Sequence, residues 1–240
     1  CENIDAAIAM LTEMLKIREV ENQLAEGRRA GLIKGPVHLG AGQEAIAVGL
    51  SKYLTPKDMV FGAHRSHAHV LALGSKIKSL FAEVLGKDSG LNKGMGGSMH
   101  LWDRNVGFYG SVPIVAGTVP LALGAALAAK LQNSGKVAVA YFGDGATEEG
   151  VVHECLNFAS IKKLPIVFVV ENNLMASHMD IYLRQPSAST ARFAVANNIA
   201  HHVIDGNNVF EVEGVSSAVI EAARKNEGPG FIEAVTYRWY

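Results

Sequence analysis

The sequence has little of the material from which disulfide scaffolds, metal clusters and polyanion-binding proteins are built. It contains two cysteines, Cys1 and Cys155, which are too few for a disulfide framework and lie in no paired metal-ligand spacing. Lysine and arginine total 22 against 23 acidic residues, so the formal charge is -1. Because no positive excess is present to hold a polyanion, we expect no nucleic-acid partner. The scarcity of cysteine also fits a reducing compartment.

Charge of either sign is scarce as well. Charged residues make up 19% of the chain, against roughly 25% in ordinary globular domains, and hydrophobic residues make up 49%. This composition excludes disorder and favours elements buried on both faces, or a surface covered by a partner. A length of 240 residues favours one large domain, residues 1–240.

One charge-free stretch, residues 112–129, has about the length of a membrane-spanning helix. It contains two prolines and two glycines and follows a glycine-rich segment, so we interpret it as a buried helix and expect no membrane association. The first 25 residues mix apolar and charged positions and do not resemble a signal peptide. The first residue is Cys rather than Met, so we expect a trimmed chain.

The hydrophobic pattern predicts an alternation of helices and strands. Helices are predicted over 4–26 and 43–54, a short strand from residue 59 runs into a loop, and 93–111 is a long irregular segment. A helix is then predicted over 113–132, a strand over 136–142, a helix to 163 and a strand over 165–170. A loop to 186, a short helix, a strand over 201–205, a helix to 225 and a strand over 231–238 follow. Continuous apolar strands separated by helices indicate an α/β fold, a doubly wound, mostly parallel sheet with helices on both faces.

Two consecutive predicted strands end in polar residues, Gly143-Asp144-Gly145 and Glu171-Asn172-Asn173. Ligands of parallel sheets bind at the carboxyl ends of the strands. The glycines permit close backbone approach, and a following helix attracts an anion, whereas Asp144 repels one. A bridging hard cation such as Mg²⁺ resolves this conflict, with Asp144, the amide oxygen of Asn173 and a backbone carbonyl as ligands.

Two other interpretations of these residues stay open. A dinucleotide site is disfavoured because Glu148 stands where G-x-G-x-x-G needs its last glycine, although Glu171 could hold a ribose hydroxyl. Alternatively, the first motif is only a strand-to-helix turn and the second an ordinary loop. The pair is more specific than either half, with 28 residues between Asp144 and Asn173.

GDG followed after about thirty residues by NN resembles the thiamine-diphosphate signature. The surrounding segments are HLGAGQEA, AHRSHAH, KGMGGSMHLWD, GFYGSVPIVAGTVPLALGAALA, GDGATEEGVVHECLNFAS and LPIVFVVENN. From about Met10 to Tyr240 the chain is similar to the alpha subunit of the first, decarboxylating component of 2-oxo acid dehydrogenase complexes (pyruvate, branched-chain and acetoin types). The resemblance implies the diphosphate-binding half of a thiamine-diphosphate-binding fold. It also implies a thiamine-diphosphate-dependent oxidoreductase that decarboxylates a 2-oxo acid, or cleaves acetoin, and passes the acyl group to a lipoyl carrier. A bacterial cytoplasm or an organelle matrix is the implied location.

The resemblance assigns site residues by position. The Mg²⁺ ligands it implies are Asp144, Asn173 and the backbone carbonyl of Met175. The cofactor contacts it implies are His64, Arg65, Gly145 and Ala146 around the diphosphate, and Pro113, Ile114 and Val115 around the aminopyrimidine ring. Arg65 also has independent support, because a guanidinium matches phosphate oxygens.

The histidines receive different assignments. His38 matches a position that contacts the substrate carboxylate, and His67 and His69 are expected to line the same pocket. His38 and His67 are the predicted catalytic residues. His64, His67 and His69 could bind a transition metal by spacing, but no carboxylate or thiolate lies near them in the sequence. His100 is expected to order its loop, and His153, His201 and His202 are predicted to be structural.

The resemblance further implies partners. The glutamate that protonates the cofactor comes from a separate beta subunit in this family, and nothing in the sequence resembles that pyrimidine-binding half. An α2β2 assembly with an apolar interface is therefore implied. Relatives continue beyond the segment TYRWY, so we expect a further C-terminal portion. Polar Ser177 and His178 after the Asn pair favour a small or hydroxylated acyl donor. A stand-alone transketolase-like enzyme and a non-catalytic assembly subunit are the alternatives.

Overall fold

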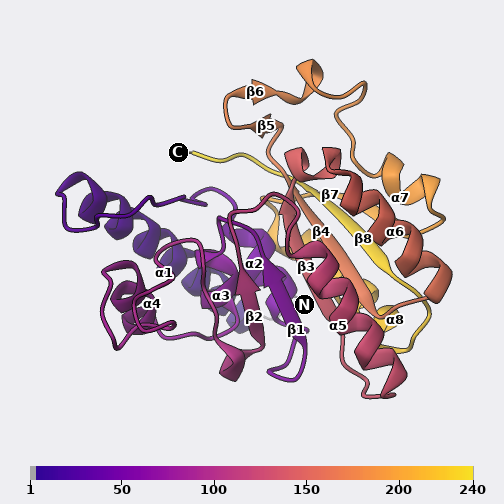
Figure 1. Cartoon of the computed structure of the whole chain (residues 1–240), viewed down its shortest axis with the longest axis horizontal. Coiled ribbons are helices and arrows are strands. Elements are labelled where there is room, and N and C mark those ends of the chain that lie inside the picture. The colour runs from indigo at the N-terminus through magenta and orange to yellow at the C-terminus, as the bar shows by residue number, and fades with distance from the viewer. Residues whose placement is uncertain (1–3, 240) are drawn as a thin grey trace.

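The computed structural model describes residues 4–239 and is built on a parallel sheet of six strands in the order β2-β1-β3-β4-β8-β7 (Figure 1). The strands are β1 (Met59–Gly62), β2 (Phe108–Ser111), β3 (Ala138–Gly143), β4 (Ile166–Asn172), β7 (Ala200–Asp205) and β8 (Gly230–Val235). Every adjacent pair runs parallel. A small antiparallel hairpin, β5 (Met175–Ala176) with β6 (Met179–Asp180), projects beyond the end of β4. The predicted fold class is confirmed.

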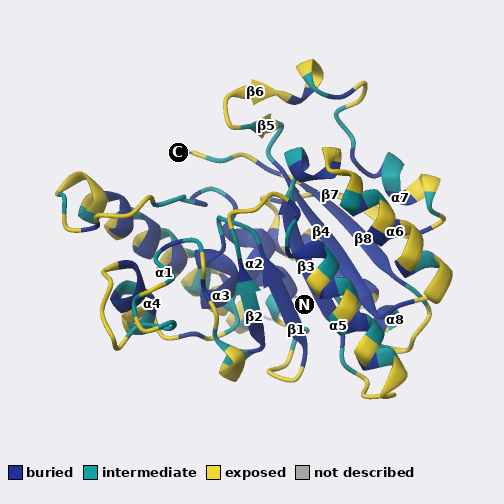
Figure 2. Cartoon of the chain, viewed as in Figure 1, coloured by how far each residue is buried: buried dark blue, intermediate teal, exposed yellow. Residues whose placement is uncertain are grey.

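Helices cover both faces of the sheet. Successive residues of each buried strand point to opposite faces, so each face carries apolar side chains that must be covered. Val167 and Val169 of β4 belong to one apolar core, and Phe168 and Val170 belong to the other. The first core takes in α1 (Ile4–Arg29), α2 (Glu44–Ser51), α3 (His67–Ala72), α4 (Ile77–Val84) and α8 (Val209–Arg224). The second takes in α5 (Val119–Leu131), α6 (Gly150–Lys162) and α7 (Arg192–Ala196). In Figure 2 the central strands are buried along their length, and the outer sides of the helices are exposed.

Several local predictions are corrected by the structure. Residues 67–72 are helical rather than a loop, α4 was not predicted, and β2 lies inside the segment predicted to be irregular. Ala116 adopts φ 57, a left-handed conformation that no helix accommodates, so α5 begins at Val119 rather than 113. Strand β4 continues through Glu171 and Asn172, because these residues pair with β8.

Short 3₁₀ turns complete the description: η1 (Arg104–Val106), η2 (Asp144–Glu148) and η3 (Ile181–Leu183). The turn η2 separates β3 from α6, so the GDG segment does not lead directly into an α-helix as expected. Within residues 4–239, no helix is long and apolar enough to cross a membrane. The charge-free stretch is a loop followed by α5, which buries Val119, Ala122, Ala126 and Ala129.

Candidate functional site

A cavity of about 340 Å³ lies at the carboxyl ends of β1, β3 and β4. Six segments of the chain form its wall, as expected where the ends of parallel strands and the loops after them meet. The lining residues are His38, Gln43, Ala63, His64, Arg65, Ile114, Val115, Ala116, Gly143, Asp144, Gly145, Ala146, Glu149, Glu171, Asn173, Met175, Ala176, Ser177 and Arg238. This set includes every site residue predicted from the sequence except His69, which is described below, and two others, Pro113 and His67.

Those two residues lie elsewhere. Pro113 is exposed beside the cavity rim, where Ile114 and Val115 are 72% and 52% exposed. His67 is fully buried and does not line the cavity, because its ring is held between Glu21 and Ser98. The structure therefore does not bring His67 to the place where a substrate would lie, contrary to the expected role.

Asp144 is buried in the wall of the cavity and forms an ion pair with Arg184 of the same chain. Its carboxylate accepts a hydrogen bond from the Arg184 guanidinium, which also pairs with Glu148. Burial raises the pKa of Asp144 above its ordinary value, although the hydrogen bond and charge of Arg184 oppose the shift. Arg184 lies forty residues downstream in the loop after β6, and the sequence contains no signal that places it here.

The two asparagines after β4 face different surroundings. Asn173 lines the cavity, where its Nδ2 donates to Gln43 Oε1 at 3.1 Å and its Oδ1 accepts from the backbone N of Met175 at 3.1 Å. Asn172 is buried and holds the following loop, since its Nδ2 donates to Glu233 Oε1 at 2.7 Å and to a carbonyl at 2.9 Å. One asparagine is thus available to a ligand, and the other fixes the backbone that carries it.

The backbone around the cavity is conformationally demanding. Ala116, Leu174 and Ser177 have φ of 57, 65 and 55, values that cost roughly 1–3 kcal/mol for residues other than glycine. Gly145 is required at its position, because a Cβ there would lie 2.8 Å from Ala176 Cβ. At Gly143 a Cβ would meet open space, so this glycine leaves room in the cavity.

Two arginines, Arg65 and Arg238, contribute positive charge to the cavity wall. Arg65 donates to the carbonyl of Leu39 at 2.8 Å, and Arg238 lines the same wall. Burial and the charge of Arg238 lower the pKa of Arg65 to about 10, which leaves Arg65 protonated at neutral pH. The next residue, Trp239, donates its backbone N–H to Ala41 at 2.9 Å and so fixes the C-terminal segment near the cavity.

The two histidines of the wall are uncharged at neutral pH. Their rings meet edge to face with centroids 5.1 Å apart. Burial, with the charge of Arg65, lowers the pKa of His64 to about 4 and also lowers the pKa of His38. Positive charge in this part of the wall therefore resides on the arginines alone.

Sequence reasoning did not identify several wall residues as site residues, notably Gln43, Glu149 and Arg238. Arg238 is the last residue of the predicted strand 231–238, so the rule that parallel strands end at one edge could have indicated it. Glu171 was considered only for a ribose contact; it also accepts a bond from His69 Nε2 at 3.0 Å, and that ring stacks on Tyr141 at 3.9 Å. His69 is therefore behind the wall rather than on it.

The donor set fits a hard divalent cation. Asp144 and Asn173 place oxygen atoms at one cavity, beside the backbone of Met175, and Mg²⁺ takes one or two protein side chains with phosphate and water. Within residues 4–239, no group of three His, Cys, Asp or Glu side chains is arranged to hold a metal. His67 and His69 are each paired with a different glutamate, which removes the basis for a transition-metal site at the three histidines.

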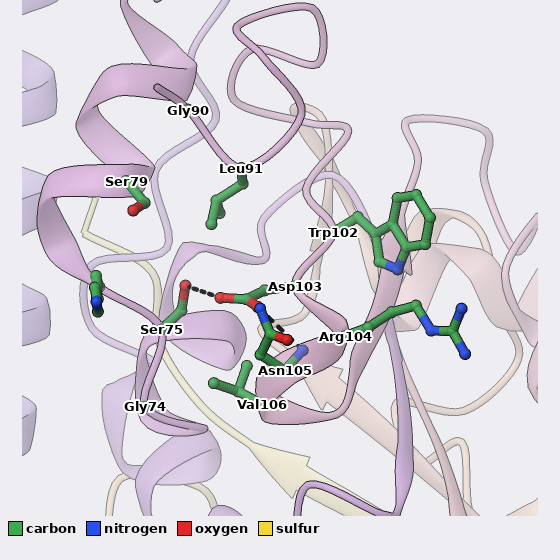
Figure 3. A pocket seen from close by; sticks show the side chains of 11 residues that line it. Gly74, Ser75, Ser79, Gly90, Leu91, Trp102, Asp103, Arg104, Asn105 and Val106 are labelled. Atoms are coloured by element: carbon green, nitrogen blue, oxygen red, sulfur yellow. Dashed lines mark hydrogen bonds between the residues drawn. The ribbon is translucent and has the colours of Figure 1, made fainter. Parts of the chain in front are cut away.

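A second cavity, of about 450 Å³, lies between α4 and η1 (Figure 3). Asp103 in its wall is already paired, accepting from Ser75 Oγ at 2.7 Å and from the backbone N of Asn105 at 3.2 Å. Figure 3 shows the Arg104 guanidinium directed away from Asp103. None of the predicted site residues lines this cavity.

Fold and cavity define a doubly wound α/β protein with a cavity at the strand ends. The solved structures include a match of the same architecture, transketolase from Campylobacter jejuni, with a TM-score of 0.71 and 20% identity over 95% of this chain and 37% of that one. At this level of identity the likeness concerns the fold alone.

Sequence comparison identifies the family. The chain belongs to the Dehydrogenase E1 component family, which it matches over residues 12–240. It is 40% identical to the alpha subunit of acetoin:2,6-dichlorophenolindophenol oxidoreductase of Bacillus subtilis, covering 98% of this chain and 71% of that protein. It is 39% identical to the alpha subunit of the pyruvate dehydrogenase E1 component of Zymomonas mobilis, covering 94% of this chain and 64% of the relative. The chain thus spans about two thirds of the relatives it matches.

Proposed function

We propose that this chain is the alpha subunit of a thiamine-diphosphate-dependent dehydrogenase that acts on a small 2-oxo acid or on acetoin. The observation that carries the proposal is the meeting of Asp144, Asn173 and Arg65 in one cavity, in a member of the E1 family. Oxygen donors for a cation and a guanidinium for an anion are the two requirements of a metal-bound diphosphate.

The residues of this chain have distinct proposed tasks toward that group. Asp144, Asn173 and the carbonyl of Met175 would hold Mg²⁺, and Arg65, with the amides of Gly145 and Ala146, would hold the diphosphate. The exposed apolar pair Ile114 and Val115 would contact the organic rings, with Pro113 and His64 nearby. Thiamine diphosphate supplies, when bound, the carbon nucleophile that attacks the substrate carbonyl.

His38 is proposed to receive the substrate carboxylate. Its neutral ring can donate one hydrogen bond, and the neighbouring arginines supply the positive charge. Ser177 also lines the cavity and adds a hydroxyl, which supports a small or hydroxylated acyl donor; His178 does not line it. His67 is not proposed as a catalytic residue.

The proposed site is half of an active site. A beta subunit would supply the pyrimidine-binding half and the glutamate that protonates the cofactor, in an α2β2 assembly, and a lipoyl carrier would accept the acyl group. These partners are proposed from family membership and from the names of relatives as alpha subunits. A bacterial cytoplasm or an organelle matrix is the proposed location.

Calorimetric titration of thiamine diphosphate, with and without Mg²⁺, tests the site. We expect Mg²⁺-dependent binding that Asp144→Ala weakens at least about a hundredfold, since loss of an outer-shell partner alone costs 10–100-fold. Asp88→Asn removes a carboxylate from an exposed loop outside the cavity and should leave binding unchanged.

The titration is repeated with a co-expressed beta subunit if the chain alone does not bind. Absence of binding there, or wild-type affinity in Asp144→Ala, would refute the thiamine-diphosphate assignment. Binding restored by the beta subunit would place the completed site across the subunit interface.

A further inference from the structure

Three buried polar side chains from distant parts of the sequence form a connected network behind the candidate site. Glu21 lies on α1, His67 begins α3 and Ser98 lies in the long loop before β2, and each is at most 4% exposed. His67 Nδ1 lies 3.3 Å from both carboxylate oxygens of Glu21, and its Nε2 lies 2.8 Å from Ser98 Oγ. Such groups are costly to bury unless they are paired, so their arrangement requires an explanation.

Both ends of the network bind the same loop. Ser98 Oγ accepts from the backbone N of His38 at 3.4 Å, and Glu21 Oε1 accepts from the backbone N of Gly40 at 3.3 Å. Between these two amides lies Leu39, whose carbonyl accepts from Arg65 at 2.8 Å. The loop 38–40 thus carries one cavity histidine and anchors the cavity arginine.

One arrangement of the hydrogen atoms gives every member of the network a partner. Glu21 accepts from Gly40, so it is satisfied as a carboxylate that also accepts from a protonated Nδ1 of His67. His67 Nε2 is then an acceptor and takes the hydroxyl proton of Ser98, whose lone pair receives the His38 amide. A neutral His67 protonated on Nδ1 gives every member of the network a partner. In the other neutral tautomer, the lone pair of Nδ1 would face the carboxylate of Glu21. A doubly protonated ring would leave the hydroxyl proton of Ser98 without an acceptor in the network.

The far end of the network is itself rigidly held. Ser98 follows a loop whose backbone amides bind the fully buried carboxylate of Glu83, at 2.9 Å from Gly94 and 2.6 Å from Gly96. Glu21 is fixed by the long helix α1. The loop that carries His38 is therefore tied to two firm supports, Glu21 and Ser98, and His67 bridges them.

We propose that Glu21, His67 and Ser98 are positioning residues that hold loop 38–40 so that His38 and Arg65 face the cavity. His67 acts through this loop and does not touch substrate. The ligand that His38 and Arg65 would receive rests on the proposed function. The hold of the network on loop 38–40 does not depend on that function.

Ser98→Ala is the main test, because it removes one hydroxyl with little change in volume. Its matched control is Ser216→Ala, which removes a hydroxyl that is also fully buried but has no hydrogen-bond partner within residues 4–239. His67→Gln is the second variant, because its side-chain oxygen can still accept from Ser98 while the bond to Glu21 is lost. All variants are made in the full-length protein.

Amide hydrogen exchange of the segment 36–42 is the first measurement. We expect Ser98→Ala to exchange about tenfold faster there than wild type, as loss of one buried hydrogen bond predicts, and Ser216→Ala to match wild type. His67→Gln should accelerate exchange at Gly40 more than at His38. Wild-type protection of this segment in both Ser98→Ala and His67→Gln would overturn the proposal.

The titration of His38, followed by NMR of its imidazole, separates positioning from a general loss of stability. Burial and the neighbouring Arg65 lower the pKa of His38, so a loosened loop should move it up toward 6.5 in Ser98→Ala and leave it unchanged in Ser216→Ala. An unchanged His38 titration in Ser98→Ala would contradict a positioning role. Thiamine-diphosphate titrations on the same samples distinguish the two proposals. If the wild-type protein does not bind the cofactor, the proposed function is refuted. The exchange and NMR results still test the positioning role of the network in that case.

Discussion

Replacement of Glu233 by glutamine should destabilise the protein although the two side chains have nearly the same shape. Glu233 is fully buried on β8, and within residues 4–239 its hydrogen-bond partners are all donors. Oε1 accepts from Asn172 Nδ2 at 2.7 Å and from the backbone N of Thr190 at 2.9 Å. Oε2 accepts from Ser189 Oγ at 2.7 Å and from the backbone N of Ala191 at 2.9 Å.

The expected magnitude follows from these contacts. Whichever way the amide of glutamine turns, its NH₂ faces the backbone N–H of Thr190 or of Ala191, which then loses its acceptor. An unpaired buried donor costs roughly 1–3 kcal/mol, and the remaining bonds lose the strength that a charged acceptor gives, roughly 1 kcal/mol more. We therefore expect a loss of about 2–4 kcal/mol in the free energy of unfolding, and a Tm lower by about 4–16 °C for a chain of this size.

Urea denaturation with matched m-values and differential scanning calorimetry measure this effect. The control is Glu221→Gln, which alters a fully exposed glutamate whose one ion pair among the described residues is with Lys225, and it should leave stability unchanged. If Glu233→Gln unfolds within 0.5 kcal/mol of wild type, the carboxylate is not the acceptor on which loop 189–191 depends, and the reasoning is wrong.

Two further predictions concern the cavity. The pKa of His64, lowered to about 4, lies below its unfolded value of 6.5, so the unfolded state binds more protons and stability should fall as pH drops from 6.5 toward 4. His64→Gln should flatten that limb of a stability–pH curve, and an unchanged slope would exclude His64 as its source. Gly145→Ala should force the added Cβ against Ala176 Cβ, 2.8 Å away, and weaken thiamine-diphosphate binding in calorimetry. The same substitution at Gly124, where a Cβ meets open space on α5, is its control and should bind like wild type.

Local chemistry explains which parts of the structure could be predicted from the sequence. Apolar runs such as Ile166–Val170 indicated buried strands, and strand order along the chain indicated that Asp144 and Asn173 meet at one edge. The short helix α3 gave no comparable signal, because its six residues include two histidines whose burial depends on Glu21 and Glu171 from other elements.

The site shows the same division. Asp144 and Gly145, which are adjacent in one motif, both lie in the cavity wall as predicted. The rule that parallel strands end at one edge of the sheet places both residues together. Arg184 was not anticipated, since its contact with Asp144 depends on the path of a long loop. His67 is adjacent to the Arg65 segment in sequence, but it begins α3, which turns its ring behind the wall.

The all-parallel order of the sheet also bears on how the cavity assembles during folding. No two adjacent strands of the six-stranded sheet can form a hairpin, so every pairing must wait for a crossover, and contacts of this kind form slowly. The shortest crossover joins β3 to β4, pairing Ala138 with Ile166, and it brings Asp144 and Asn173 together. Arg65 and Arg238 reach the cavity only through the much longer connections that pair β1 with β3 and β4 with β8. The oxygen ligands of the proposed metal site should thus be assembled early, by local chain closure, and the two arginines of the cavity wall should be added last.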